Sequence, residues 1–322
     1  MAEDDTNQGI PAPEGHAEII QTDYEIGQDN IETNIGPFGL DIHNPVFLIS
    51  GLSIVLFVFY TLALPEQSGE MFSWLFGVVT KSFDWFFLSA ANIFVIFCLL
   101  LIVTPVGKVR LGGADARPDY SYMGWFAMLF AAGMGIGLMF YGVSEPMSHF
   151  ASSMGGVSVG EDGVRTDWAP LGAAAGDTAA AERLAFAATI FHWGLHPWAI
   201  YAVVALALAL FSYNKGLPLT IRSAFYPILG ERVWGWWGHL IDILAVFATL
   251  FGLATSLGFG ATQANAGLNE LFGIPVGPTT EVILISAITA AALTSVLRCL
   301  ARRVTVLSEI SMGPAFALFL FF

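Results

Sequence analysis

Long apolar runs, separated by short stretches that carry the charges, are the most regular pattern in this sequence. The runs are apolar on all sides and lack the alternation of β-barrel strands, and most approach the roughly 20 residues that a helix needs to cross a bilayer. We therefore expect transmembrane helices at residues 46–64, 85–106, 122–146, 184–211, 240–260 and 282–297, and the start of a seventh near Val304.

The seventh run contains the letters MGPAFALFLFF and reaches residue 322 with no flanking charge. A complete protein is not expected to stop within an apolar span. The sequence is therefore interpreted as the amino-terminal part of a longer protein, truncated within about its seventh transmembrane helix.

Composition and charge indicate the class of protein and its orientation in the membrane. Hydrophobic residues make up 56% of the chain and charged residues 12%, which is typical of an integral membrane protein. By the positive-inside rule, the loops in which basic residues gather are cytoplasmic, so we expect a multi-pass protein of the inner (plasma) membrane with a cytoplasmic amino terminus. These basic residues follow the second, fourth and sixth spans: Lys108, Arg110, Arg117, Lys215, Arg222, Arg232, Arg298, Arg302 and Arg303.

Residues 1–41 carry many acidic side chains and neither Lys nor Arg, in a chain whose formal net charge is -14. Such a segment is polar and repels itself, so it is predicted to be a disordered cytoplasmic tail. A plain solvated extension and a regulatory tail that senses ions or lipid both fit this composition.

Signatures of several other functions are missing from the sequence. It has no Ser-His-Asp order, phosphate-binding loop or basic nucleic-acid patch, so neither an enzyme nor a nucleic-acid-binding protein is expected. Cys98 and Cys299 predict neither a disulfide framework nor a thiolate metal site. His192 and His196 have the spacing of a zinc pair, but no third ligand follows, and no cofactor is expected.

Two carboxylates fall at the ends of expected spans. Glu145, in the pair Glu145–Pro146, is interpreted either as an ion-coupling carboxylate or as a structural hydrogen-bonding group. Asp242 begins the fifth span, where we expect it to pair with Arg222 or Arg232 at the membrane interface.

The stretch AAGMGIGLMFYGVSEP, residues 131–146, places several glycines inside an apolar run, where they weaken a helix. Gly133 and Gly137 form a GxxxG pattern, which favours close packing of a neighbouring helix. Alternatively, GMGIG unwinds at membrane depth and frees backbone groups, which is tolerated only where the backbone lines a cavity. Free N–H groups would then hold a carboxylate, and free carbonyl groups a sodium ion.

Three aromatic residues in the stretch FHWGLHPWAIY form a second candidate element. On a continuous helix, Trp198 and Tyr201 are rotated from Trp193 by about 140° and about 80°, so the three rings share one side. Such rings can form a box that binds a quaternary ammonium group through cation–π attraction. The alternative is that the rings pack against lipid or other helices.

Together, AAGMGIGLMFYGVSEP, HWGLHPWAIY and the later FATLFGLATSLGFGATQ resemble the betaine/choline/carnitine transporter (BCCT) family, from about Asn44 to the end of the sequence. The resemblance implies an all-α integral membrane protein with twelve transmembrane helices that forms homotrimers. Its third to seventh and eighth to twelfth helices would be inverted repeats of the neurotransmitter-sodium-symporter fold. Residues 42–121 would then hold two peripheral helices and a basic cytoplasmic loop, and residues 122–322 the first inverted repeat.

The resemblance also implies roles for individual residues. The glycine stretch would contact the substrate carboxylate, and the aromatic box, completed by eighth-helix tryptophans beyond this sequence, would hold the ammonium group. The implied substrate-binding residues are Ala132, Gly133, Met134, Gly135, Ile136, Gly137, Trp193, Trp198 and Tyr201. Sodium is the implied coupling ion, bound by backbone oxygens of Ala131 and Met134, with Thr249 as the candidate ligand of a second sodium site.

Gly137 bears on the choice of substrate. Choline-type members of the family tend to carry Asp at this position, because a cation without a carboxylate benefits from an added negative charge. Glycine therefore favours a zwitterion such as glycine betaine, and ectoine, proline and dimethylsulfoniopropionate fit the same argument.

These observations favour sodium-coupled secondary active uptake of a small zwitterionic quaternary-ammonium osmolyte by alternating access. The expected partners are that substrate, the lipid bilayer and, in the full-length protein, two further copies of the chain, with no nucleic acid. The alternatives are a sodium-independent antiporter, proton-coupled uptake of choline- or carnitine-type substrates, and a non-transporting structural membrane protein.

Overall fold

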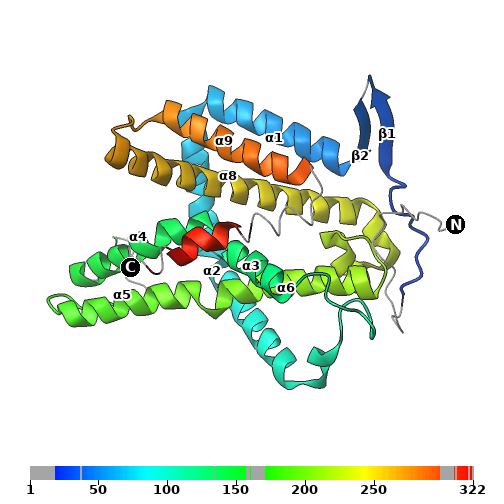
Figure 1. The fold of residues 1–322 in the computed structure, drawn as a ribbon, viewed down its shortest axis with the longest axis horizontal. Helices are drawn as coiled ribbons and strands as arrows, with labels where there is room; N and C mark the ends of the chain where they lie inside the picture. The colour runs from blue at the N-terminus through cyan, green and yellow to red at the C-terminus, as the bar shows by residue number, and fades with distance from the viewer. Residues whose placement is uncertain are drawn as a thin grey trace. The chain divides into compact units, whose positions relative to one another are not determined.

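The computed structural model describes residues 19–36, 38–133, 135–156, 160, 171–297, 308, 310–317 and 320, and these residues are mainly helical (Figure 1). The expected all-α membrane architecture is confirmed in this part of the chain. The residues form two compact units that alternate along the sequence. The first unit comprises Met1–Ala116 and Trp193–Thr249, and the second comprises Arg117–His192 and Leu250–Phe322.

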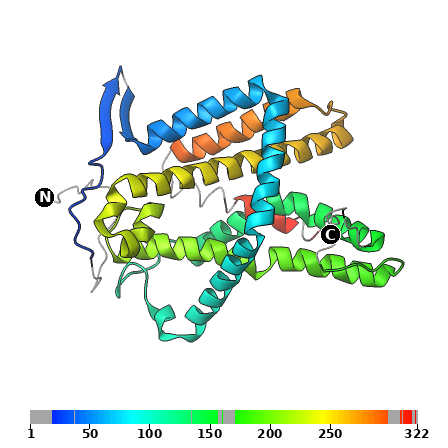
Figure 2. The same ribbon diagram turned by 180° about the vertical axis from the view of Figure 1, so that it is seen from behind.

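The first unit contains a hairpin, two long helices and a segment of short helical turns. Its elements are β1 Asn30–Ile35, β2 Phe38–His43, α1 Val46–Ala63, α2 Pro65–Val103, η1 Pro105–Lys108, α6 Leu195–Ala209, the π-helical η2 Leu210–Asn214, η3 Ile221–Phe225, α7 Tyr226–Leu229, η4 Gly230–Trp234 and the start of α8 Trp236–Phe272. Within this unit, α6 lies against α2, as Figure 2 shows.

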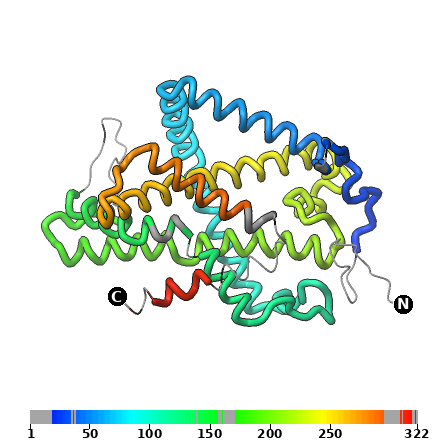
Figure 3. Tube along the Cα trace, turned by 45° about the horizontal axis from the view of Figure 1, so that its top comes forward, coloured from blue at the N-terminus to red at the C-terminus, as the bar shows by residue number. Residues whose placement is uncertain are grey.

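The second unit is built from helices throughout its described residues. Its elements are α3 Tyr122–Gly133, α4 Ile136–Gly155, α5 Thr178–Trp193 except for its last residue, the part of α8 from Leu250 onward, and α9 Pro278–Leu297, with further helical residues at 310–317. The green helices α4 and α5 lie side by side in all three views (Figure 3).

Helices occupy all six of the apolar runs identified from the sequence. Within the described residues, those long and apolar enough to cross a bilayer are Val46–Ala63, Pro65–Val103, Thr178–Asn214 and Trp236–Phe272. Tyr122–Gly133 and Pro278–Leu293 are apolar but shorter. The seventh run, from Val304, lies mostly outside the described residues.

The second span differs from its expected limits, because α2 begins at Pro65 instead of residue 85. Pro65 occupies the first turn, where the missing N–H of proline costs no hydrogen bond. The 39 residues of α2 correspond to roughly 58 Å at about 1.5 Å per residue, nearly twice the hydrocarbon thickness of a bilayer. Hydropathy detected only the apolar half, since charged residues such as Glu70 and Lys81 break an apolar run without breaking a helix.

The expectation that residues 1–41 are disordered needs correction where the structure describes them. β1 and β2 pair in antiparallel register from Asn30 opposite His43 to Ile35 opposite Phe38. Asn30 Nδ2 donates to Asp41 Oδ1 at 2.7 Å, so a side-chain hydrogen bond joins the two strands in addition to their backbone pairing. Residues 1–18 lie outside the described residues.

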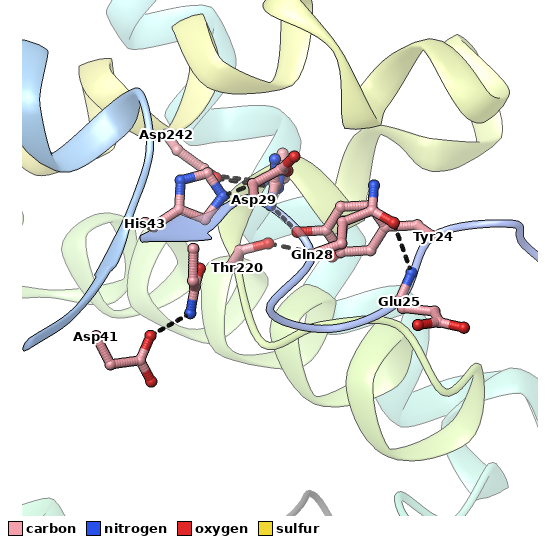
Figure 4. Close-up of polar contacts among 11 residues, drawn as sticks. Tyr24, Glu25, Gln28, Asp29, Asp41, His43, Thr220 and Asp242 are labelled. Carbon is pink, nitrogen blue, oxygen red and sulfur yellow. Dashed lines mark hydrogen bonds and ion pairs between the residues drawn. The ribbon is translucent and has the colours of Figure 1, made fainter. Parts of the chain in front are cut away.

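Arg222 connects the amino-terminal segment to the rest of the first unit. Its side chain is only 1% exposed and its Nε lies 3.2 Å from Asp242 Oδ2, which confirms one of the two pairings expected for Asp242. One terminal nitrogen donates to Tyr24 Oη and to His43 Nε2, each at 3.0 Å. Figure 4 shows Tyr24, His43 and Asp242 converging from three segments of the unit.

The guanidinium of Arg222 also lies over two aromatic rings. Its carbon is 5.3 Å from the Tyr24 ring centroid and 5.4 Å from the Trp234 ring centroid, and these two rings stack with centroids 4.3 Å apart. Burial raises the pKa of Tyr24, so its hydroxyl remains neutral and can accept the hydrogen bond from Arg222. Because a buried charge is costly when it is left unpaired, these contacts make Arg222 the anchor of residues 19–43.

Replacing Arg222 by Lys keeps the charge but removes the planar group that bridges Tyr24, Trp234 and Asp242. We expect residues 19–43 to detach more readily in Arg222→Lys, so limited chymotrypsin digestion should cleave this segment several-fold faster than in the wild type. Arg232→Lys, in the same loop but exposed, should behave like the wild type. Equal rates in all three proteins would show that the guanidinium does not hold the segment.

Candidate functional site

The third expected span consists of two helices, with an interruption between Gly133 and Ile136. Gly135 has the extended backbone angles φ -77° and ψ 173°, and no side chain of the described residues caps α4 at this residue. The ends of helices leave N–H and C=O groups without partners in the helix. The interruption therefore presents the N–H groups of Gly135, Ile136 and Gly137 at the start of α4, and the Ala131 carbonyl group at the end of α3.

The glycine stretch is accessible at its described residues. Those partly or fully exposed are Ala131, Ala132, Gly133, Gly135 and Gly137. A Cβ atom built on Gly135 would meet no atom within 4 Å, and its φ of -77° suits any L-residue. Glycine thus leaves open space beside the N–H groups without being required by the backbone. Met134 and the side chain of Ile136 lie outside the described residues.

An aromatic cluster one turn into α4 was missed by the sequence analysis. Phe140 stacks on Phe259 of α8 with ring centroids 5.1 Å apart, and Tyr141 meets the same ring nearly edge-on at 5.8 Å. This cluster connects the start of α4 to α8 within the second unit. All three residues belong to the quoted family motifs, but no local pattern pairs two apolar helices.

Farther along α4, Glu145 is a buried carboxylate with 8% exposure. Its Oε1 lies 2.7 Å from Nδ1 of His192 on α5 and 3.2 Å from Nε2 of His149 on α4. His196, the other member of the expected zinc-type pair, instead lies 3.2 Å from Asn92 Oδ1 through its Nε2. The two histidines therefore have separate partners, and no group of three or more His, Cys, Asp or Glu residues that could hold a metal ion is found among the described residues.

Trp193, Trp198 and Tyr201 do not lie on one continuous helix, as the calculation of their shared side assumed. α5 ends at Trp193, and Gly194, with φ -77° and ψ -132°, separates it from α6. An angle calculated for a continuous helix does not extend across such a break. The break was not anticipated, although glycine followed by Pro197 in the first turn of α6 is a local signal for it.

Trp198 and Tyr201 do face the same side of α6. Their ring centroids are 6.0 Å apart, and the two residues are 43% and 69% exposed. The indole Nε1 of Trp198 donates to the Trp193 carbonyl oxygen at 3.1 Å, which connects the two sides of the break. The pair therefore has accessible ring faces, which is the chemistry that attracts a quaternary ammonium group.

Thr249, the candidate sodium ligand, is an exposed residue of α8. Its hydroxyl donates to the Ala245 carbonyl oxygen at 2.8 Å, and a hydroxyl that donates its hydrogen keeps lone pairs for a cation. Thr249 and the aromatic rings belong to the first unit, and the glycine stretch belongs to the second.

Long apolar helices, an interrupted helix and accessible aromatic rings are together typical of a membrane transport protein. A family model described as BCCT, betaine/carnitine/choline family transporter, matches residues 45–322, and the chain belongs to this family. Its members are transporters and not enzymes.

Three bacterial relatives, all from Vibrio parahaemolyticus, show the extent of the similarity. The chain is 64% identical to a glycine betaine/proline/choline transporter, over 99% of the chain and 57% of the relative. It is 53% identical to glycine betaine transporter 1, over 93% and 54%, and 48% identical to a glycine betaine/proline/choline/ectoine transporter, over 94% and 51%. The chain thus spans about half the length of the curated relatives it matches.

Because a methyl group on Gly135 meets no neighbour, Gly135→Ala should fold as well as the wild type. We expect its apparent Tm to match that of Gly142→Ala, a control on α4 whose added Cβ also meets nothing within 4 Å. The free energy of unfolding of both variants should lie within about 0.5 kcal/mol of the wild-type value. A selective loss of stability in Gly135→Ala would mean that the glycine serves packing.

Proposed function

We propose that the protein containing this chain takes up a small zwitterionic quaternary-ammonium osmolyte, such as glycine betaine, by sodium-coupled secondary transport across the inner membrane. The observation that carries the proposal is the helix interruption between Gly133 and Ile136, within the region that matches the family. The names of the relatives add support, since all three include glycine betaine.

The glycine stretch is suited to the substrate carboxylate. The N–H groups of Gly135, Ile136 and Gly137 lie at the amino end of α4, where the helix dipole favours a negative charge. No carboxylate side chain occurs in this stretch, so an anionic group would meet no local repulsion. We assign backbone contacts with the substrate to Ala132–Gly137.

The ring faces of Trp198 and Tyr201 are suited to the quaternary ammonium end. Cation–π attraction needs no hydrogen bond and contributes about 0.5–2 kcal/mol. Trp193 supplies the carbonyl group that orients the Trp198 indole, and its own ring is partly buried.

Sodium is proposed to bind through the carbonyl oxygens of Ala131 and Met134, with the Thr249 hydroxyl as part of a second site. An ion that holds the interruption open would raise affinity for the substrate, and the substrate would raise affinity for the ion by the same factor. The complete protein would be a homotrimer with a cytoplasmic amino terminus, and residues 122–322 would move as part of an inverted repeat during alternating access.

Choline is the second candidate substrate, because two of the three relatives carry it in their names. Choline is a cation without a carboxylate, so the N–H groups at Gly135 and Gly137 would meet only its neutral hydroxyl oxygen and no negative charge. Competition separates the two substrates: excess unlabelled choline should inhibit glycine betaine uptake weakly if the zwitterion is preferred.

The proposal is tested by uptake of labelled glycine betaine into cells that express the complete gene. We expect uptake when sodium is the external cation and at least tenfold less with potassium. Equal uptake of glycine betaine with sodium and with potassium would support an antiporter or a proton-coupled carrier. Uptake of choline without uptake of glycine betaine would contradict the zwitterionic substrate.

Two substitutions test the proposed contacts. Gly135→Ala should raise the apparent KM at least tenfold, because the methyl group fills the space beside the N–H groups, while Gly142→Ala should leave it unchanged. Trp198→Leu should also raise the KM, by about tenfold for a lost interaction of about 1.4 kcal/mol. Trp74→Leu, at an exposed tryptophan of α2, is the control. Normal KM values in Gly135→Ala and Trp198→Leu would favour packing roles for both residues.

A further inference from the structure

Glu145 is a buried acidic residue that has no role in the substrate contacts proposed above. Building on the proposed function, we propose that Glu145 is a positioning residue, which holds the carboxyl end of α5 through His192 and thereby sets the geometry of the break at Gly194. It would act through its hydrogen-bonding oxygen and not as a charge that carries the coupling ion.

The carboxylate lies between two imidazole rings. Glu145 Oε1 is 2.7 Å from His192 Nδ1 and 3.2 Å from His149 Nε2. A carboxylate only accepts hydrogen bonds, so both nitrogens carry a hydrogen when Glu145 is ionised, and a neutral imidazole is then held in one tautomer and one orientation. The side chain of Glu145 is 8% exposed and that of His149 is 14% exposed, whereas that of His192 is 65% exposed. His192 is thus held by a buried partner although its own surface is open.

The contact joins two weak points in the helices. Pro146 follows Glu145 inside α4 and removes one backbone N–H from the helix, which loosens it at this turn. His192 is followed in the chain by Trp193, the last residue of α5, and then by Gly194. A short hydrogen bond between these two places restrains both, because neither helix is fully secured there by its own backbone bonds.

The restraint bears on transport through the residue next to His192. The Trp193 carbonyl oxygen accepts the indole hydrogen of Trp198, so the direction of that carbonyl group affects the orientation of a proposed substrate-binding ring. If Glu145 only holds His192, an uncharged hydrogen-bond acceptor at position 145 will preserve substrate uptake. If Glu145 instead carries a coupling ion or proton, its negative charge is essential.

Substitutions at both ends of the contact separate these roles. Glu145→Gln keeps an oxygen acceptor without the charge, and Glu145→Ala removes both. His192→Asn keeps a donor near the position of Nδ1, and His192→Phe removes it. Ser148→Ala is the control on α4, because the Ser148 hydroxyl bonds only locally to the Ser144 carbonyl oxygen among the contacts described.

In the complete protein, we expect glycine betaine uptake with a KM within about threefold of the wild type for Glu145→Gln and His192→Asn. Glu145→Ala and His192→Phe should raise the KM at least tenfold at equal amounts of protein in the membrane. Loss of uptake in Glu145→Gln as complete as in Glu145→Ala would overturn the positioning role, and so would normal KM values in Glu145→Ala and His192→Phe.

A measurement without substrate separates failure of this inference from failure of the proposed function. In the complete protein with Cys98, Cys299 and any cysteine beyond residue 322 replaced by Ala, a single cysteine is introduced as Gly194→Cys and its rate of maleimide labelling is measured. The rate should rise at least fivefold on adding Glu145→Ala or His192→Phe and stay unchanged with Glu145→Gln. An unchanged rate with both disruptive variants would overturn the inference, whether or not the protein transports glycine betaine.

Discussion

Every backbone N–H and C=O group in the apolar interior of a membrane needs a hydrogen-bond partner, and this constraint organises the structure. It makes the apolar runs helical, and it makes an interruption costly unless the freed groups meet another partner. Among the described residues, the spans are interrupted at Gly133–Ile136 and at Gly194. Both interruptions lie in the region that matches the transporter family, so the backbone itself is central to the proposed function.

Buried charged groups follow the same rule in side-chain form. Arg222, 1% exposed, lies against a carboxylate, a phenol, an imidazole and two ring faces. Glu145, 8% exposed, has imidazole nitrogens as partners. In each unit, a charge taken from water thus selects partners from separate segments, and satisfying it holds those segments together.

The two candidate elements have chemistries that match the two ends of a zwitterion. Free N–H groups at the start of α4 suit an anionic group, and the accessible rings of Trp198 and Tyr201 suit a cation that cannot donate hydrogen bonds. Each element alone would fit many ligands. Their combination in one family-specific chain is what narrows the proposal to quaternary-ammonium osmolytes.

By itself, the sequence determined the helical membrane class and the approximate positions of the six described spans, because apolar length acts locally. It offered an interruption at the glycine stretch as one of two interpretations, since glycine weakens a helix but also permits close packing. It also supplied the rings of Trp198 and Tyr201, which are close enough in sequence for helix geometry to pair them. Only the tertiary structure decided the contact between Tyr24 and Arg222, 198 residues apart, the stacking of Phe140 on Phe259 and the link from Glu145 to His192. Such contacts depend on how distant segments pack, and no local pattern of residues encodes that packing.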